Sequence, residues 1–138
     1  MRWGNSFGYL PPADTVRSLA GMHRLLRPGG RLVLESTTVA ESLLPGGIAP
    51  HSEIEFGGIR MTRTNRYNAP ESRLETDYVF TDEAGTVERS RAAHHIHTAA
   101  EVARLLHGAG FGDVRLLGGD GTTPYALGAP RMIAVAIA

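Results

Sequence analysis

The chain has 138 residues and no cysteine, and its 14 basic and 14 acidic side chains give a formal net charge of +0 at pH 7. This length suits one domain over residues 1–138, and the balanced charge excludes the electrostatic attraction that draws proteins to nucleic acid or to an anionic membrane. The lack of cysteine excludes disulfides and thiolate chemistry, and the lack of a membrane-spanning run or signal-peptide pattern favours a cytoplasmic location.

The first third of the chain predicts a loop, a helix and a buried strand. Residues 1–12 hold glycines, prolines and aromatic side chains that favour an ordered loop, and Asp14 is the expected N-cap of the helix that follows. Pro28 ends that helix, and Gly29 or Gly30 supplies the positive φ of its C-cap. The apolar face of the helix is formed by Val16, Leu19, Met22 or His23, and Leu26. The unbroken apolar run at 32–34 predicts a strand at 31–36 that is covered on both faces.

The rest of the chain predicts mostly strands. Residues 37–58 are expected to be irregular, whereas 59–67, 74–81 and 86–97 are rich in β-favouring residues, with a hairpin loop at 82–85. Residues 98–101 have the pattern of a capping box, which opens a helix that ends at Gly110. The last strands are predicted at 114–117 and 132–137. These elements indicate an α/β fold: a partial doubly wound sheet with an antiparallel β excursion at 59–97.

Four segments resemble class I S-adenosylmethionine-dependent methyltransferases. They are WGNSFGY at 3–9, LLRPGGRLVLE at 25–35, HTAAEVARLLHGAGF at 97–111 and RMIAVA at 131–136. They are similar to the family's loop after its fourth strand, its following helix and fifth strand, its next helix, and its final strand. The resemblance therefore covers the C-terminal half of the family's fold.

The family's cofactor motif, a Gly-rich turn after the first strand, has no counterpart in this sequence. The resemblance implies that the strand at 31–36 normally lies inside the sheet, so in this chain we expect it to be an edge. Exposed apolar edges attract partners. We therefore expect a homodimer, or a partner that supplies the missing half.

By the resemblance, the loop Asn5, Ser6, Phe7, Gly8 and Tyr9 lies beside the cofactor's sulfonium and the substrate. Aromatic rings attract onium groups through cation–π interactions, which makes this loop the candidate cofactor-binding site. The alternative is a turn whose Phe7 and Tyr9 only pack against the core.

Three residues are candidates for substrate binding. Glu35 ends the buried strand and would face the ligand edge of the sheet, unless it is only a solvated carboxylate. Arg131 opens the final strand, where it would bind an acidic group or form a surface ion pair. Tyr125 and the glycine-rich loop before it would line the substrate entrance.

The histidines at 94, 95 and 97 also have two interpretations. The predicted strand places His95 and His97 on one face and His94 on the other. No spacing in the sequence indicates a metal site, so no metal is expected. His97 is the candidate catalytic base, because imidazole accepts protons near neutral pH. The alternative is a partly exposed strand edge beside the capping box.

The resemblance implies direct methyl transfer from S-adenosylmethionine to an oxygen, nitrogen or carbon of a small molecule. In that chemistry the protein needs only to position the reactants and, for some acceptors, to remove a proton. The alternatives are a non-catalytic remnant that serves as a small-ligand-binding or protein-interaction module, and a fragment of a longer protein.

Overall fold

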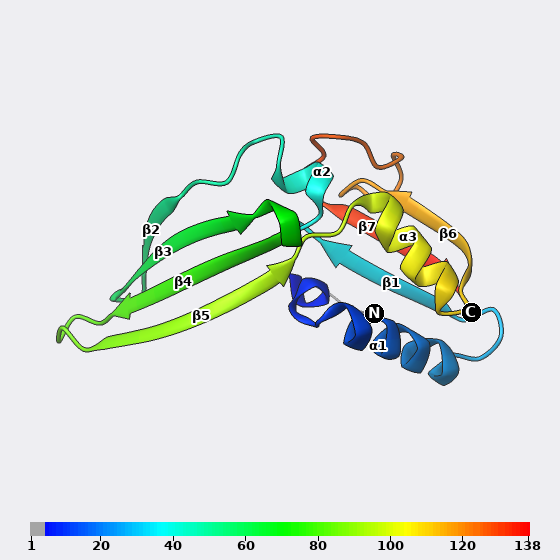
Figure 1. Cartoon of the computed structure of the whole chain (residues 1–138), viewed down its shortest axis with the longest axis horizontal. Coiled ribbons are helices and arrows are strands. Elements are labelled where there is room, and N and C mark those ends of the chain that lie inside the picture. Colours follow the sequence, from blue (N-terminus) through cyan, green and yellow to red (C-terminus); the bar gives the residue numbers. More distant parts are fainter. Residues whose placement is uncertain (1–4) are drawn as a thin grey trace.

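The computed structural model describes residues 5–138, so Trp3 and Gly4 of the predicted loop lie outside the described residues. Figure 1 shows helices and strands arranged in two parts. A body holds β1, β6, β7, α1 and α3, and a long antiparallel sheet projects from it. The elements in chain order are η1 (Asn5–Tyr9), α1 (Pro12–Leu25), β1 (Arg31–Ser36), α2 (Ala40–Leu43), β2 (His51–Phe56), β3 (Ile59–Asn68), η2 (Ala69–Glu71), β4 (Arg73–Thr81), β5 (Val87–His95), α3 (Ala99–Gly108), β6 (Gly112–Leu117) and β7 (Met132–Ile137). No helix among the described residues is long and apolar enough to span a membrane.

The body is a three-stranded sheet in the order β1-β7-β6. β7 runs antiparallel to both neighbours, so β1 and β6 point the same way. Among residues 5–138, β1 is an edge strand, which confirms the expectation from sequence. Helices α1 and α3 contact each other, and they share a core with the sheet. That core contains Leu19, Leu32, Leu34, Val102, Leu106, Phe111, Met132, Ala134 and Ala136.

The prediction that β1 is covered on both faces is only partly right. Leu32 and Leu34 are buried, but Val33 between them is half-buried. Successive side chains of a strand point to opposite faces. The helices therefore bury one face of β1 completely, and the described residues cover the other face less.

Helix α1 begins earlier than the sequence indicated. Its N-cap is Pro11, and Asp14 lies in the first turn, so the N-cap prediction is wrong. The Thr15 hydroxyl donates to the carbonyls of Leu10 (3.3 Å) and Pro11 (3.2 Å) and is buried, whereas Val16 is exposed. Proline fixes φ and donates no hydrogen bond, so it is tolerated at a helix start. The predicted face is otherwise kept, because Leu19 is buried and Met22 and Leu26 pack against the core.

The turn after α1 forms as predicted. Gly29 adopts φ +76°, the left-handed conformation that glycine tolerates. A Cβ atom on Gly30 would lie 2.8 Å from the carbonyl oxygen of Arg27, so a side chain there would collide with the end of the helix. Gly29 thus allows the backbone conformation of the turn, and Gly30 leaves the space that a side chain would occupy.

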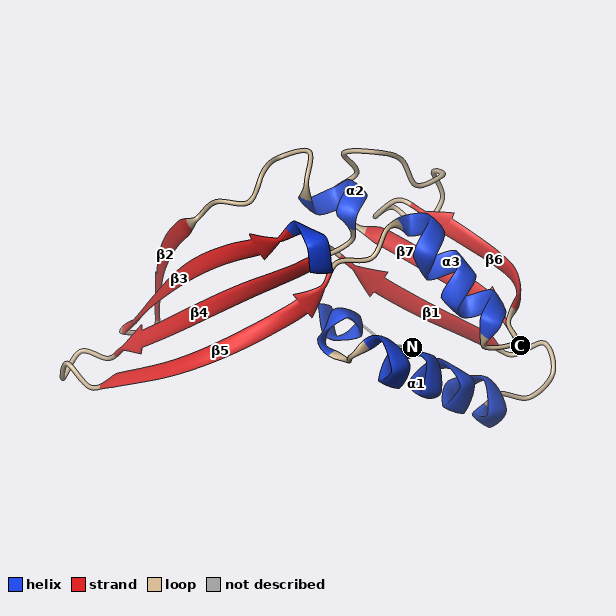
Figure 2. Ribbon diagram, in the orientation of Figure 1, coloured by secondary structure: helices blue, strands red, loops and turns tan. Residues whose placement is uncertain are grey.

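The second sheet is an antiparallel meander in the order β2-β3-β4-β5 (Figure 2). Its last three strands match the predicted ones, except that β5 ends at His95 rather than at residue 97. Strand β2 was predicted to be irregular. Its six residues are mostly exposed and carry little apolar signal, but every one pairs with β3. Backbone pairing with a neighbour, which local sequence does not encode, makes it a strand.

The pairing register sorts the side chains of this sheet onto two faces. We call one the pocket face. It carries Ser52, Ile54, Phe56, Ile59, Met61, Arg63, Asn65, Tyr67, Leu74, Thr76, Tyr78, Phe80, Glu88, Ser90, Ala92 and His94. The other, the charged face, carries Glu53, Glu55, Arg60, Arg66, Arg73, Glu75, Asp77, Arg89 and Arg91 among others.

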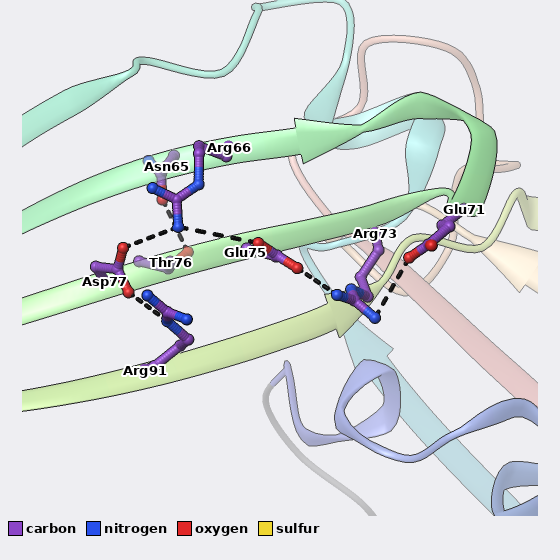
Figure 3. A network of polar contacts seen from close by, with 8 residues as sticks. All are labelled: Asn65, Arg66, Glu71, Arg73, Glu75, Thr76, Asp77 and Arg91. Carbon is purple, nitrogen blue, oxygen red and sulfur yellow. Dashed lines mark hydrogen bonds and ion pairs between the residues drawn. The ribbon is translucent and has the colours of Figure 1, made fainter.

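On the charged face, arginines and carboxylates alternate across the strands (Figure 3). Arg66 lies 3.0 Å from Asp77 and 3.9 Å from Glu75, and Arg91 bonds Asp77 at 2.6 Å. Arg73 pairs with Glu75 and Glu71. These contacts lower the pKa values of Glu75 and Asp77, in each case chiefly through the hydrogen bond from an arginine. Cross-strand pairs of opposite charge favour one register over its neighbours.

Helix α3 has half of the predicted capping box. The Thr98 side chain accepts a hydrogen bond from the Glu101 amide at 3.1 Å. The Glu101 carboxylate contacts His97 Nδ1 at 3.1 Å. The amide of Ala99, the first residue of the helix, donates to both carboxylate oxygens of Glu41, at 2.9 and 3.1 Å. The helix start is thereby tied to α2, and α2 lies beside the junction of the two sheets.

Candidate functional site

The candidate cofactor loop forms η1, which lies against the ends of β1 and β5. Gly8 allows this close approach, because a Cβ atom there would be 2.9 Å from the carbonyl oxygen of His95. Phe7 is buried, and its ring centroid lies 5.5 Å from that of His97. Tyr9 is 50% exposed, with its ring 4.0 Å from that of His94. Of the two aromatic candidates, Tyr9 presents a ring to solvent and Phe7 packs in the core.

Of the other residues of this loop, Ser6 is half-buried and Asn5 begins η1. The role of the five residues in cofactor binding stays a prediction, and the geometry favours Tyr9 as the contact to a cation.

His94 lies at the inner end of the pocket face, in register with Leu74. Both of its ring nitrogens are buried and lack a hydrogen-bond partner among the described residues. Burial lowers the pKa of His94 because it disfavours the charged imidazolium. Burial also raises the pKa of Tyr9, and the neighbouring Tyr78 adds to that shift. The structure thus brings His94, Tyr9 and Tyr78 together as a neutral cluster.

We expect His94 to make the protein less stable in mild acid. Since its pKa is lowered on folding, the unfolded chain takes up the proton first, and stability falls as the pH drops below about 6.5. His94→Leu should reduce this loss between pH 7.5 and 5, which urea unfolding at several pH values would measure. His51→Leu, at an exposed position of β2, is the matched control. Equal pH dependence in His94→Leu and the wild type would contradict the expectation.

His97 does not lie in a strand but just beyond β5, where its carbonyl accepts from the Ala40 amide at 2.9 Å. Its side chain is buried, with Nδ1 on Glu101 and with Nε2 lacking a partner among the described residues. A carboxylate on one ring nitrogen is the usual way to orient a histidine. The catalytic role stays a prediction.

A small cavity of about 10 Å³ lies beside His97. It is lined by Phe7, Gly8, Leu34, Ser36, Thr38, Val39, His95, His97, Val102 and Met132. This volume is about that of one water molecule. An acceptor molecule would therefore reach His97 only after side chains move.

A larger pocket of about 330 Å³ lies at the junction of the two sheets. Its floor is the pocket face, with Ser52, Arg63, Asn65, Leu74, Thr76, Tyr78 and His94. Its walls come from Thr37 and Thr38 after β1, Leu43 of α2, and residues 47–49. Thr76 donates to Asn65 Oδ1 at 2.8 Å, and Asn65 donates to the Ala49 carbonyl at 2.9 Å, which holds the wall against the floor. A pocket of this size suits a small organic molecule.

The three candidate substrate residues lie elsewhere. Glu35 is buried, so the alternative of a solvated carboxylate is wrong. Arg131 lies 3.5 Å from Glu35 and forms an ion pair with it, in agreement with the second interpretation of Arg131. The Tyr125 hydroxyl is 2.6 Å from Ser42 Oγ, which ties the loop before β7 to α2. These contacts hold the loop at the carboxyl end of β1, and substrate binding by the three residues stays a prediction.

The loop that contains Arg131 also borders an open hollow of about 730 Å³, lined by residues between Gly118 and Arg131. Asp120 closes this loop on itself, because it accepts from the amides of Thr122 and Thr123, both at 2.9 Å. Within residues 5–138, no three histidine, aspartate or glutamate side chains gather in a way that would hold a metal ion.

Reasoning from sequence missed the pocket floor. The predicted strands contain Arg63, Asn65, Thr76 and Tyr78. Alternation places Arg63 and Asn65 on one face of their strand, and Thr76 and Tyr78 on one face of theirs. The register between strands, which sets them side by side, was not visible in the sequence. The wall residues 47–49 fall in the segment predicted to be irregular.

No known family model matches the sequence, and no curated protein matches it. Solved structures do match the fold. One is an S-adenosylmethionine-dependent methyltransferase from Clostridium acetobutylicum, with a TM-score of 0.80 and 9% identity over 96% of this chain and 55% of that chain. The CcbJ methyltransferase from Streptomyces caelestis has a TM-score of 0.79 and 14% identity over 97% of this chain and 54% of that chain.

This chain carries part of an S-adenosylmethionine-dependent methyltransferase fold. A third match, the sugar N-methyltransferase KedS8 from Streptoalloteichus, has a TM-score of 0.62 and 24% identity over 96% of this chain and 52% of that chain. The chain spans about half the length of the solved methyltransferases it matches. In this methyltransferase fold, the 330 Å³ pocket and the exposed ring of Tyr9 are the candidate functional site.

Proposed function

We propose that this chain forms the acceptor-binding part of an S-adenosylmethionine-dependent methyltransferase that acts on a small molecule. The observation that carries the proposal is the place of Tyr9. Its half-exposed ring contacts His94, and His94 lines the 330 Å³ pocket. Tyr9 does not itself line the pocket, but its contact with His94 sets an aromatic ring next to the lining, where a sulfonium would approach a bound methyl acceptor.

Residues of this chain fit such a cofactor only in part. Tyr9 offers a ring to the sulfonium, while Phe7 is buried against His97 and serves the core. S-adenosylmethionine, when bound, supplies an activated methyl group. The chain's own task is then to hold the acceptor atom in line with that group and to exclude water.

We propose that the remaining cofactor contacts come from a strand-bearing segment that pairs with the free edge of β1, either in a longer form of this polypeptide or in a partner. β1 is an edge among the described residues, and edge strands present unpaired backbone groups. The alternative is a homodimer, in which a second copy of this chain covers the edge of β1.

An amine on a sugar is the acceptor we propose. The basis is that one structural match is a sugar N-methyltransferase, together with the polar side chains of the pocket floor. Hydroxyl and amide groups such as those of Thr76, Tyr78 and Asn65 are suited to hydrogen bonds with a hydroxylated molecule.

Calorimetric titration of the chain with S-adenosylmethionine and with S-adenosylhomocysteine tests the proposal. We expect saturable heat with both. Tyr9→Leu should weaken binding of the sulfonium compound about fivefold, because it removes a cation–π contact, and should leave the neutral thioether unaffected. Tyr125→Phe is the control, because it keeps the aromatic ring and removes only the hydroxyl that lies 2.6 Å from Ser42 Oγ. No heat at about 1 mM of either ligand would overturn cofactor binding by this chain alone.

The second candidate function is a small-ligand-binding module without catalysis. The observation that favours it is the 330 Å³ pocket, which the described residues of this chain form by themselves. Such a module would bind ligands in the 330 Å³ pocket and give no heat with either cofactor form.

A further inference from the structure

The two faces of the β2–β5 sheet differ in how their arginines are paired. On the charged face, Arg60, Arg66, Arg73 and Arg91 each lie within ion-pair distance of a carboxylate, and only the exposed Arg89 has no ion pair among the described residues. On the pocket face, the register places one arginine, Arg63, and one carboxylate, Glu88. Glu88 is not among the residues that line the pocket.

Arg63 is held in place without a counter-charge. It is half-buried, and its Nε donates to Ser52 Oγ at 3.0 Å. Its terminal nitrogens have no carboxylate partner among residues 5–138, and the lining of the pocket contains no aspartate or glutamate. A guanidinium that is partly removed from water and has no anion beside it is stabilised by any anion that enters.

The fixed orientation of Arg63 is also suited to recognition. The planar guanidinium presents a fork of donors that matches the two oxygens of a carboxylate or a phosphate. Since Nε is already bound to Ser52, the terminal groups are the ones left to face the pocket. Tyr78 lies directly opposite on β4, in register with Arg63, and adds a hydroxyl beside the same space.

The register also gives the distance between the two ends of the pocket. Arg63 and Tyr67 are four residues apart on β3, and Tyr67 is in register with Leu74, which is itself in register with His94. Four residues of a strand extend about 13 Å. Two strand spacings of about 4.8 Å also separate β3 from β5, so Arg63 and His94 lie at opposite ends of the pocket floor, with their backbone positions about 16 Å apart.

We propose that Arg63 is the specificity residue of the acceptor pocket, and that the methyl acceptor carries a carboxylate or phosphate group that binds Arg63 while its reacting atom lies at the Tyr9 end. This inference rests on the proposed function, because it takes the pocket to be the acceptor site. It adds the anionic class of the acceptor and the residue that selects it.

Nuclear magnetic resonance titration of the full chain tests the inference without methyl transfer. Inorganic phosphate and acetate are the probes, each added at constant ionic strength with chloride as the balancing ion. We expect saturable shifts of the Arg63 Nε–H signal and of the Asn65, Thr76 and Tyr78 amides. Saturation by phosphate alone indicates a phosphorylated acceptor, and saturation by acetate alone indicates a carboxylic acid; saturation by both supports the shared oxyanion chemistry.

Matched variants make the result specific. Arg63→Gln should weaken binding about tenfold or more, since it removes the charge and the donor fork, and Arg63→Lys should recover part of it. Arg89→Gln is the control, because Arg89 is exposed, lies on the charged face of the same sheet and has no ion pair among the described residues. Shifts that do not saturate, or that Arg63→Gln and Arg89→Gln reduce alike, overturn the inference.

A kinetic measurement separates this inference from the proposed function. If methyl transfer is reconstituted, Arg63→Gln should raise KM for an anionic acceptor about tenfold, change kcat little, and leave KM for an uncharged analogue unchanged. A protein that binds phosphate through Arg63 but transfers no methyl group contradicts only the proposed function. A protein that transfers methyl groups with an unchanged KM in Arg63→Gln contradicts only this inference.

Discussion

Leu106→Ala should lower the free energy of unfolding by about 3 kcal/mol. Leu106 lies on α3 with 0% of its surface exposed, in the core that α1, α3 and the three-stranded sheet share. Removing its side chain loses the transfer free energy of the buried atoms and leaves a cavity that rigid neighbours fill only in part. Urea unfolding followed by circular dichroism and by fluorescence measures the change.

The control for this substitution is Leu25→Ala. Leu25 is also a helical leucine, but it is 88% exposed at the end of α1, so its loss should change stability by no more than about 0.5 kcal/mol. Equal effects of the two substitutions would show that α3 does not pack as described. Coincident unfolding transitions by circular dichroism and by fluorescence would show that the two sheets unfold together.

Gly8→Ala should destabilise the protein by about 1–3 kcal/mol and move η1 away from β5. The added Cβ atom would meet the His95 carbonyl oxygen at 2.9 Å, and a backbone atom yields less easily than the end of a flexible side chain. The ring contact between Tyr9 and His94 should weaken as a result, which the chemical shifts of the His94 ring protons report.

Gly46→Ala is the matched control for this effect. A Cβ atom on Gly46 meets no atom within 4 Å, so the substitution should be close to neutral or slightly stabilising through the unfolded chain. If Gly8→Ala leaves both the stability and the His94 signals as they are in Gly46→Ala, then the loop does not depend on the close approach. Cofactor titration of Gly8→Ala would then be expected to match the wild type.

Local patterns were sufficient for the strands and helices with strong apolar signals. The apolar runs at 32–34 and 132–137 indicated β1 and β7, and Thr98 with the apolar spacing after it indicated α3. The Pro-Gly-Gly turn was also correct, because proline and glycine restrict the backbone wherever they occur.

Patterns failed where a neighbour in space decides the outcome. Strand β2 has exposed side chains and exists because β3 pairs with it. The Glu101 carboxylate contacts His97, and Glu41 from a distant segment binds the Ala99 amide that begins α3. Glu35 was a solvated strand end in one interpretation, but the structure buries it beside Arg131.

Local motifs and their order along the chain were enough to recognise the resemblance to methyltransferases, the loop that carries Tyr9 and, within residues 5–138, the edge position of β1. Which residues meet depends on the packing of segments in space. The register of β3 and β4 places Arg63 beside Tyr78, and the close approach of Gly8 to β5 brings Tyr9 onto His94. The physical reason is that register and packing depend on contacts between segments far apart in the chain, and short-range patterns do not encode those contacts.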